Sequence, residues 1–250
     1  MSLKIGIIGV CGKMGKALLE EILIKKKQNP PFELVFGIGR PKSPKINDDL
    51  ATLIHLPPMG IKVTKGLLAK ADVAIDFSSA EAIVSLLPQL EEKKIPLIVG
   101  TTGLEAHHLK KMKESAKKIP ILYSPNFSTG IFTLYRLVKK LALAFPKSSI
   151  DIIETHHQEK KDAPSGTAHL LAKGIEAAGH KNVKIHSIRA GKIPGEHVIH
   201  LATDDERIEI KHQALSRRAF ALGALEAAKM LVNFAPGFYT IDDFSGSFFS

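Results

Sequence analysis

The fold is decided by one stretch near the start of the chain, Ile5-Gly6-Ile7-Ile8-Gly9-Val10-Cys11-Gly12-Lys13-Met14-Gly15. Its first half is a short apolar run that predicts a buried strand, and the amphipathic spacing from Lys13 onward predicts a helix. Glycines between the two permit a tight turn, in which backbone N–H groups can approach a pyrophosphate at the positive end of the helix. This order of strand, glycine turn and helix is typical of the first unit of a dinucleotide-binding Rossmann domain.

The glycine spacing in this turn is G-x-x-G-x-x-G, with Cys11 at the place where a middle glycine often lies. A purely structural turn is the alternative interpretation of this spacing. We interpret Cys11 as a small packing residue rather than a nucleophile. The candidate cofactor-binding residues of the turn are Gly9, Val10, Cys11, Gly12, Lys13 and Met14.

Strands and helices alternate through the first half of the chain. Runs rich in Val, Ile and Leu predict strands over residues 4–9, 33–38, 72–77, 96–100 and 119–123. Apolar residues three and four apart predict helices over residues 13–27, 80–93, 104–118 and 129–144. Repeated strand–helix–strand units imply an α/β fold with a Rossmann-type parallel sheet and right-handed crossovers.

The pattern changes in the second half of the chain. More polar alternation predicts strands over residues 149–155, 182–188, 197–202 and 207–214, with one helix over 166–178. This favours a second, α+β domain built on an open mixed or antiparallel sheet. A last helix (216–233) and strand (238–241) are expected to return to the first sheet. The predicted domains are residues 1–127 for the dinucleotide, 128–214 for the second domain, and 215–250 for the returning segment.

The end of the second predicted strand bears on the choice of cofactor. An acidic residue there would accept a hydrogen bond from the ribose 2′-OH and favour NAD. The chain instead has Gly37-Ile38-Gly39-Arg40, with Lys42 close by, and two cations suit a 2′-phosphate. NADPH is therefore the expected cofactor and NADH the alternative, in which Arg40 only stacks on adenine.

An unusual cluster lies just past the midpoint, where a strand leads through His156-His157-Gln158-Glu159-Lys160-Lys161-Asp162 to the helix start Pro164-Ser165-Gly166-Thr167. N–H groups at a helix start bind carboxylates, lysine donates protons, and histidine works as an acid or base near neutral pH. The cluster predicts a site for a small anion, and a solvated basic loop is the alternative. No metal is expected, because adjacent histidines on a strand point to opposite faces.

These pieces together resemble the dihydrodipicolinate reductase family, over essentially the whole chain. The matching stretches are Gly9–Gly15, Asp76-Phe77-Ser78, Gly100-Thr101-Thr102-Gly103, Pro125-Asn126-Phe127-Ser128, His156-His157, Lys160 through Ala168, Arg189-Ala190-Gly191, Gly195-Glu196-His197 and Ser216-Arg217. The segment ending at Ala168 is highly specific, whereas the glycine turn is not.

The resemblance implies an NAD(P)H-dependent reduction of 4-hydroxy-tetrahydrodipicolinate, a small cyclic dicarboxylate, in the diaminopimelate route to lysine. It implies His156 as the acid/base residue and Lys160 as the proton donor, with His157, Gly166 and Thr167 binding the substrate. It further implies a homotetramer joined through the second domain. The chain departs from the family pattern at Gln158 and Glu159, where many relatives carry Arg and His. Beyond the glycine turn, the implied cofactor-lining residues are Arg40, Gly100, Thr101, Thr102, Ser124, Pro125, Asn126 and Phe127.

The amino-acid composition narrows the classes of partner and cellular location that we expect. The formal net charge is +10, but the lysines are scattered and tryptophan is absent, so we expect small anions rather than nucleic acid as partners. No apolar run is long enough for a membrane span. A single cysteine and a start without a signal-peptide pattern lead us to expect a cytoplasmic protein.

Two rival functions remain as alternatives. A semialdehyde dehydrogenase shares a Rossmann half but needs a catalytic cysteine in its substrate domain, and Cys11 lies in the nucleotide turn. A nucleotide-sensing module without catalysis would keep the glycine turn but would not need the cluster of His156 and Lys160.

Overall fold

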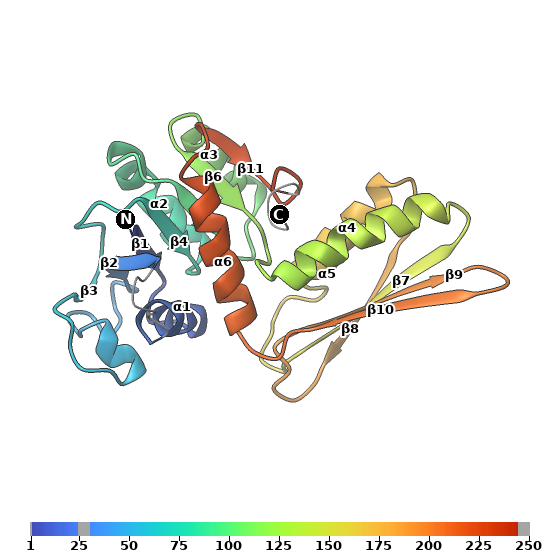
Figure 1. The fold of residues 1–250 in the computed structure, drawn as a ribbon, viewed down its shortest axis with the longest axis horizontal. Coiled ribbons are helices and arrows are strands. Elements are labelled where there is room, and N and C mark those ends of the chain that lie inside the picture. The colour runs from blue at the N-terminus through green and yellow to red at the C-terminus, as the bar shows by residue number, and fades with distance from the viewer. Residues whose placement is uncertain (1, 25–30, 245–250) are drawn as a thin grey trace. The chain divides into compact units, whose positions relative to one another are not determined.

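The computed structural model describes residues 2–24 and 31–244, and it divides into two compact units. The first is built from the described parts of Met1–Phe127 and Phe220–Ser250, and the second is Ser128–Ala219. Figure 1 labels the helices and strands of each unit. The chain therefore leaves the first unit once and comes back to it.

The first unit is a seven-stranded sheet in the order β11-β6-β5-β4-β1-β2-β3, and all six strand pairs are parallel. The chain goes from β1 to β2 on one side and to β4 on the other, so β1 is the point at which strand order reverses. Ligands of open parallel sheets bind at the carboxyl ends of the strands near such a point. The strands are β1 (Leu3–Ile8), β2 (Phe32–Ile38), β3 (Val63–Thr64), β4 (Val73–Asp76), β5 (Leu97–Val99), β6 (Pro120–Tyr123) and β11 (Gly237–Tyr239).

Helices α1 (Lys13–Leu23), α2 (Ala80–Glu92), α3 (Ala106–Ser115) and α6 (Arg218–Leu231) belong with this sheet, together with the 3-10 turn η1 (Ala51–Ile54). Strands β4 and β5 are buried along their whole length, as expected of central parallel strands. One part of the core lies between these strands and α2 and α3, and contains Ile83, Leu87, Leu97 and Met112.

The second unit is a four-stranded sheet in the order β10-β9-β7-β8. Its strands are β7 (Ser149–His156), β8 (Lys184–Arg189), β9 (Glu196–Ala202) and β10 (Arg207–Gln213). Strand β7 is antiparallel to β9 and parallel to β8, so the sheet is mixed. Helices α4 (Thr129–Ala144) and α5 (Gly166–Ala177) lie beside this sheet (Figure 1). The predicted fold class, a Rossmann-type parallel sheet with a second unit on an open mixed sheet, is confirmed.

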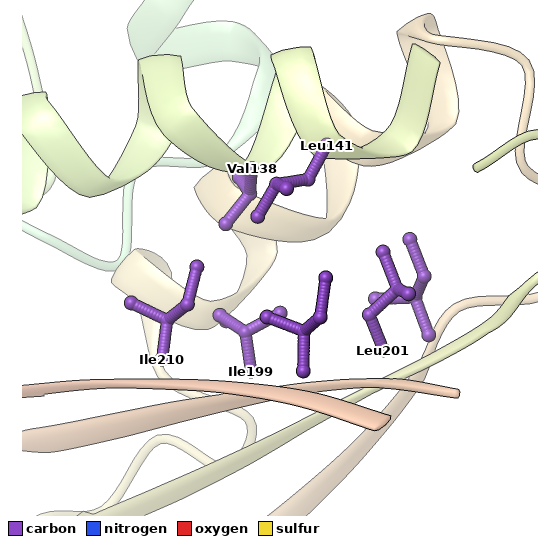
Figure 2. A pocket seen from close by; sticks show the side chains of 7 residues that line it. Val138, Leu141, Ile199, Leu201 and Ile210 are labelled. Carbon is purple, nitrogen blue, oxygen red and sulfur yellow. The ribbon is translucent and has the colours of Figure 1, made fainter. Parts of the chain in front are cut away.

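A small apolar cavity separates α4 from the sheet of the second unit. In Figure 2, Val138 and Leu141 project from the helix toward Ile199, Leu201 and Ile210 on the strands, and Ile150 and Ile208 complete the lining. Every lining side chain is aliphatic, so nothing there can bind a carboxylate. We assign this cavity to the packing of the core rather than to the substrate.

The predicted elements match the observed ones to within a few residues, apart from two short elements of the first unit. The sequence analysis did not anticipate η1 or β3, which hold the chain between β2 and β4. The last residues of the helix predicted over 13–27 lie outside the described residues. Within the described ranges, none of the helices is both long enough and apolar enough to cross a membrane.

Candidate functional site

The predicted cofactor-binding residues lie along one edge of the first sheet. Gly9 through Met14 follow β1, Arg40 follows β2, Gly100 through Thr102 follow β5, and Ser124 through Phe127 follow β6. Backbone hydrogen bonds connect neighbouring strand ends: Gly9 and Val10 donate to Ile38 at 2.9 and 3.1 Å, and Ser124 donates to Val99 at 3.1 Å. The fold therefore brings all four segments to the carboxyl edge that the topology favours for a ligand.

The glycine turn has the geometry of a phosphate loop. Gly9 has a φ of +82°, and a Cβ there would lie 2.4 Å from the Phe77 carbonyl oxygen. A Cβ on Gly15 would lie 2.5 Å from the Gly9 oxygen and from Val10 Cα, so α1 packs directly on the turn. Gly12 is the N-cap residue of α1 and has no side chain to cap the helix, whereas Ser79, Ser128 and Ser165 cap their helices. A bound anion can fill that role.

A buried carboxyl group ties two of these strand ends together. Asp76, at the end of β4, is inaccessible to solvent and accepts hydrogen bonds from the Ser78 N–H at 3.1 Å and the Thr101 hydroxyl at 2.6 Å. Ser78 N–H also donates to Thr101 Oγ1 at 2.9 Å. Burial raises the pKa of Asp76 to about 7, because its effect is larger than that of the hydrogen bonds from Ser78 and Thr101, which lower the pKa. The sequence offered Asp76 only as part of a matching motif, and the structure gives it a role in fixing the loops after β4 and β5.

The end of β2 is closely packed at Gly39. A Cβ there would lie 2.8 Å from Val63 Cγ1 and 3.3 Å from Cys11 Sγ, so a larger residue would require these side chains to shift. Arg40 and Lys42, just beyond, are exposed. Cys11 is half-buried, and burial raises the pKa of its thiol above the ordinary value, which supports packing rather than nucleophilic work.

In the second unit, strand alternation places Glu154 and His156 on the same, buried face of β7 as Ile150 and Ile152. The sheet register sets His197 of β9 opposite Glu154, and His212 of β10 opposite His197. A run of polar side chains therefore crosses the inner face at the end of a sheet whose other inner residues are aliphatic. Buried polar groups of this kind need partners. Glu154 and His156 hydrogen-bond to each other, whereas His197 Nδ1 and His212 Nδ1 have no hydrogen-bond partner among the described residues.

The carboxylate of Glu154 is the centre of this group. Its Oε2 accepts from His156 Nδ1 and from Arg189 Nη1 at 3.0 Å, and its Oε1 accepts from Arg189 Nη2 at 2.8 Å and from the Ser165 N–H at 3.2 Å. Glu154 is fully buried. Burial alone would raise its pKa, but the bonds from Arg189, Ser187 and His156 outweigh this and lower it to about 2.

His156 is held in one orientation by this carboxylate. An ionised carboxylate only accepts, so the proton of the neutral ring lies on Nδ1 and Nε2 carries the lone pair. Burial lowers the pKa of His156, more than the bond to Glu154 raises it. Nε2 lies beside Gly195, where an added Cβ would be 3.0 Å away.

Lys160 lies on the loop after β7, and its side chain is only 18% exposed. Its ammonium pairs with both oxygens of Asp162 at 2.8 Å, and burial would raise the pKa of that carboxyl, but the pairing with Lys160 lowers it overall. Lys160 also interacts electrostatically with His156 and His197. The two predicted catalytic residues thus belong to one group of charges.

The start of α5 adjoins the same group. The Ser165 hydroxyl caps the helix by accepting the Ala168 N–H at 3.2 Å, which confirms the predicted cap, and it lies 3.3 Å from His197 Nε2. Gly166 and Thr167, the predicted substrate-binding residues, form the first turn, while His157 follows β7 and is half-buried. The Glu154–Ser165 bond therefore places the helix start beside His156.

Sequence reasoning gave no role in this group to Glu154, His197 or His212, and it named Arg189 and His197 only within stretches that match the family. One signal was available: Glu154 and His197 are polar residues on strands whose alternate positions are apolar, at Ile150, Ile152, Ile199 and Leu201. His197 is deeply buried, and burial lowers its pKa to about 3. His212 lies 3.2 Å from the Ser128 hydroxyl, and burial lowers its pKa as well.

A second group of possible metal ligands has a different explanation. Glu105, His107 and His108 bring candidate ligand atoms within 4.8 Å of one another at the start of α3. His108 Nδ1 accepts the Glu105 N–H at 3.1 Å, which uses that nitrogen as part of a cap. The positive end of a helix also disfavours a cation. We therefore assign Glu105 and His108 to helix capping, and His107 lies beside the Glu105 carboxylate, with 3.3 Å between Nδ1 and Oε2.

Comparison with known proteins covers both units. The model of the dihydrodipicolinate reductase N-terminus matches residues 3–127, and that of its C-terminus matches residues 130–244. A 4-hydroxy-tetrahydrodipicolinate reductase of Caldanaerobacter subterraneus subsp. tengcongensis is 38% identical over 97% of this chain and 98% of its own. The reductase named for Nitratiruptor is 38% identical over 98% of this chain and 99% of its own.

Solved structures share the fold. A dipicolinate-bound dihydrodipicolinate reductase from Paenisporosarcina superposes with a TM-score of 0.75 at 22% identity, covering 96% of this chain and 98% of the other. An aspartate semialdehyde dehydrogenase II of Vibrio cholerae superposes with a TM-score of 0.58 at 12% identity, covering 93% and 99%. The rival dehydrogenase class thus has a related fold, and fold alone does not separate the two activities.

Proposed function

The chain belongs to the dihydrodipicolinate reductase family, and from this premise we propose how its own residues reduce 4-hydroxy-tetrahydrodipicolinate on the route to lysine. The protein is a nicotinamide-dependent oxidoreductase. One observation carries the assignment of roles: Glu154 joins His156, Arg189 and the start of α5 in a single hydrogen-bonded group. Lys160 interacts electrostatically with His156 of this group.

The first unit fits a dinucleotide. The uncapped start of α1 and the turn from Gly9 to Met14 suit its pyrophosphate, and the ends of β5 and β6 line the same edge of the sheet. When bound, the reduced nicotinamide supplies the hydride that the substrate ring accepts at C4. The residues proposed to hold it are Gly9, Val10, Cys11, Gly12, Lys13, Met14, Arg40, Gly100, Thr101, Thr102, Ser124, Pro125, Asn126 and Phe127.

The second unit fits a cyclic dicarboxylate. We assign His157 and the N–H groups of Gly166 and Thr167 to the substrate carboxylates, because a helix start favours anions. Loss of water from the substrate leaves a conjugated cyclic imine, and negative charge moves toward the ring nitrogen as hydride adds to C4. The Lys160 ammonium delivers the proton to that nitrogen, and neutral His156 accepts a proton or hydrogen bond at Nε2.

Beyond the single chain, the resemblance supports a homotetramer joined through the second unit and a cytoplasmic location. Gln158 and Glu159, both exposed, reduce the positive charge on the loop, and we propose that they tune substrate affinity rather than the chemistry.

A coupled assay tests the proposed function. The substrate is made in the cuvette from pyruvate and aspartate semialdehyde by a condensing enzyme, and the absorbance of the reduced dinucleotide is followed. We expect absorbance to fall only when this protein and both precursors are present. Cofactor binding without oxidation would instead support the nucleotide-sensing alternative. Oxidation of a semialdehyde without the condensing enzyme would support the dehydrogenase.

Cofactor preference gives a separate prediction. We propose NADPH, with Arg40 meeting the 2′-phosphate, because Arg40 and Lys42 are exposed just beyond β2 and Gly39 places no acidic side chain there. Replacing Arg40 with alanine is expected to raise the KM for NADPH about tenfold, on the order of one charge-assisted hydrogen bond, and to leave the KM for NADH within about twofold.

The matched control is Lys45→Ala, which removes a cation from the same loop. Lys45 already pairs with Asp48 at 3.5 Å, so its loss is expected to change neither KM by more than about twofold. Equal effects of Arg40→Ala on both cofactors would remove Arg40 from phosphate recognition, and a lower KM for NADH in the unaltered protein would reverse the preference.

A further inference from the structure

Glu154 is at the centre of the hydrogen-bonded group, but the proposed mechanism gives it no step of its own. It is a fully buried, ionised carboxylate, and its hydrogen-bond partners lie on β7, on β8 and at the start of α5. A buried charge is retained only where partners compensate for the lost solvation. Three such partners of Glu154 are His156, Arg189 and Ser165.

The first partner is the His156 ring. Glu154 Oε2 accepts from Nδ1, which leaves Nε2, the nitrogen beside Gly195, as the only ring atom available for acid–base work. Without an acceptor at Nδ1, a neutral imidazole is free to place its proton on either nitrogen. An orienting carboxylate of this kind determines both the tautomer and the direction of the ring.

The second partner is Arg189, which donates to both oxygens of Glu154 at 3.0 and 2.8 Å. This bidentate geometry fixes the plane of the carboxylate. The same guanidinium donates to the backbone oxygen of Asp162, on the loop that carries Lys160. Arg189 therefore connects Glu154 to the proton donor through the backbone rather than through the Lys160 side chain.

The third partner is the Ser165 N–H, which donates to Oε1 at 3.2 Å. Ser165 is the cap of α5, and the two residues that follow it are those assigned to the substrate carboxylates. Hydrogen bonds from His156, from Arg189 twice and from Ser165 thus converge on two oxygens, and the Ser187 side chain also favours the ionised form. An amide in place of the carboxylate would set its own NH₂ against one or more of them.

We propose that Glu154 is the positioning residue of this site: its carboxylate holds the His156 ring in one tautomer and joins the Lys160 loop to the first turn of α5. Arg189 is its counter-charge. The inference rests on the proposed function, because it assigns to Glu154 the alignment of groups that act on the substrate. Glu154 itself contacts no reacting atom.

The first test is made on the unaltered protein without substrate, and a variant serves only to assign the signal. Ring nitrogen chemical shifts of His156 are measured by NMR on ¹⁵N-histidine-labelled protein between about pH 7 and 8, near or above the ordinary histidine range, and are assigned with a His156→Asn variant. We expect the neutral ring to carry its proton on Nδ1. A proton on Nε2, or rapid averaging between the two tautomers, would overturn the proposal.

The second test is Glu154→Gln, with Glu196→Gln as the matched control. Glu196 lies in the neighbouring strand opposite Thr155 and pairs with Lys211 at 3.0 Å, so it loses the same charge without facing His156. We expect Glu154→Gln to lower kcat at least tenfold and raise the substrate KM severalfold. The Kd for the reduced dinucleotide, measured by fluorescence, should stay within about twofold.

The pH profile separates positioning from general damage. The groups that face His156 are Glu154 on its own strand, Arg189 on β8, His197 on β9, and Lys160 and Asp162 on the loop. Glu154 is the group whose contact raises the pKa of His156, so its loss is expected to shift the limb of the kcat/KM profile that follows His156 toward lower pH. Glu196→Gln is expected to leave that limb in place.

The outcomes are distinguishable. If the unaltered protein reduces no substrate, the proposed function fails, while the tautomer measurement still decides the role of Glu154. If the protein is active and Glu154→Gln keeps kcat, substrate KM and the pH limb, the positioning role fails alone. If Glu154→Gln does not fold, the tautomer of the unaltered protein decides.

Discussion

Replacing Lys160 with alanine is expected to lower kcat at least tenfold, toward the loss of about 10²–10⁴ that follows removal of a positioned general acid. The reason is that His156 cannot readily replace Lys160 as the proton donor. Burial lowers the pKa of His156 and favours its neutral form, and its Nδ1 proton is donated to Glu154. The Kd for the reduced dinucleotide should change little, because Lys160 belongs to the second unit. Steady-state rates in the coupled assay and fluorescence titration measure both.

Lys161→Ala is the control for this prediction. It removes one positive charge from the next position in the loop, where the side chain is exposed. We expect its kcat to stay within about twofold, since exposed charges contribute little at physiological salt. A Lys160→Ala enzyme with unchanged turnover, or two lysine variants with equal losses, would remove Lys160 from the proton transfer.

Replacing Gly15 with alanine is expected to reduce both stability and cofactor binding. The new Cβ would lie 2.5 Å from three backbone atoms of Gly9 and Val10, and backbone cannot move aside as a flexible side chain can. Overpacking of this kind costs about 1–3 kcal/mol of unfolding free energy, which exceeds the helix propensity that alanine gains. Because α1 must shift away from the turn, we expect the Kd for the dinucleotide to rise at least tenfold.

Gly66→Ala is the matched control, since a Cβ there would meet only Gln89 Oε1, at 3.6 Å. Denaturant titration of both variants gives the change in unfolding free energy, and fluorescence titration gives the Kd. We expect the Gly66 variant to stay within about 0.5 kcal/mol of the unaltered protein. If Gly15→Ala binds the dinucleotide normally, the close packing of α1 on the turn is not what shapes the phosphate site.

Element types and order followed from local pattern. Apolar runs, periodic helices and the glycine turn are properties of short segments, and they predicted the parallel sheet and the second, mixed sheet. The elements that pattern did not predict are short: β3 has two residues and η1 has four. Neither is long enough to show a period, and both form because the chain between β2 and β4 packs against the sheet edge.

The edge proposed for the cofactor could also be predicted from the sequence, because residues that directly follow parallel strands must gather at one edge of the sheet. Asp76 shows the limit of that reasoning. Its place at the end of β4 was evident, but its hydrogen bond to Thr101, 25 residues further along the chain, depends on how β4 and β5 pair. The same burial raises its pKa to about 7, and burial cannot be derived from the motif.

By itself, the sequence determined the succession of strands and helices, the glycine turn, and the chemistry of the residues from His156 to Thr167, because each depends on neighbours along the chain. Only the tertiary structure decided which of the charged groups meet. Arg189 lies 35 residues from Glu154 and Ser165 lies 11 residues from it, and strand pairing together with the docking of α5 brings all three into contact. The physical reason is that a buried charge has to find its partners in space, wherever they lie in the chain.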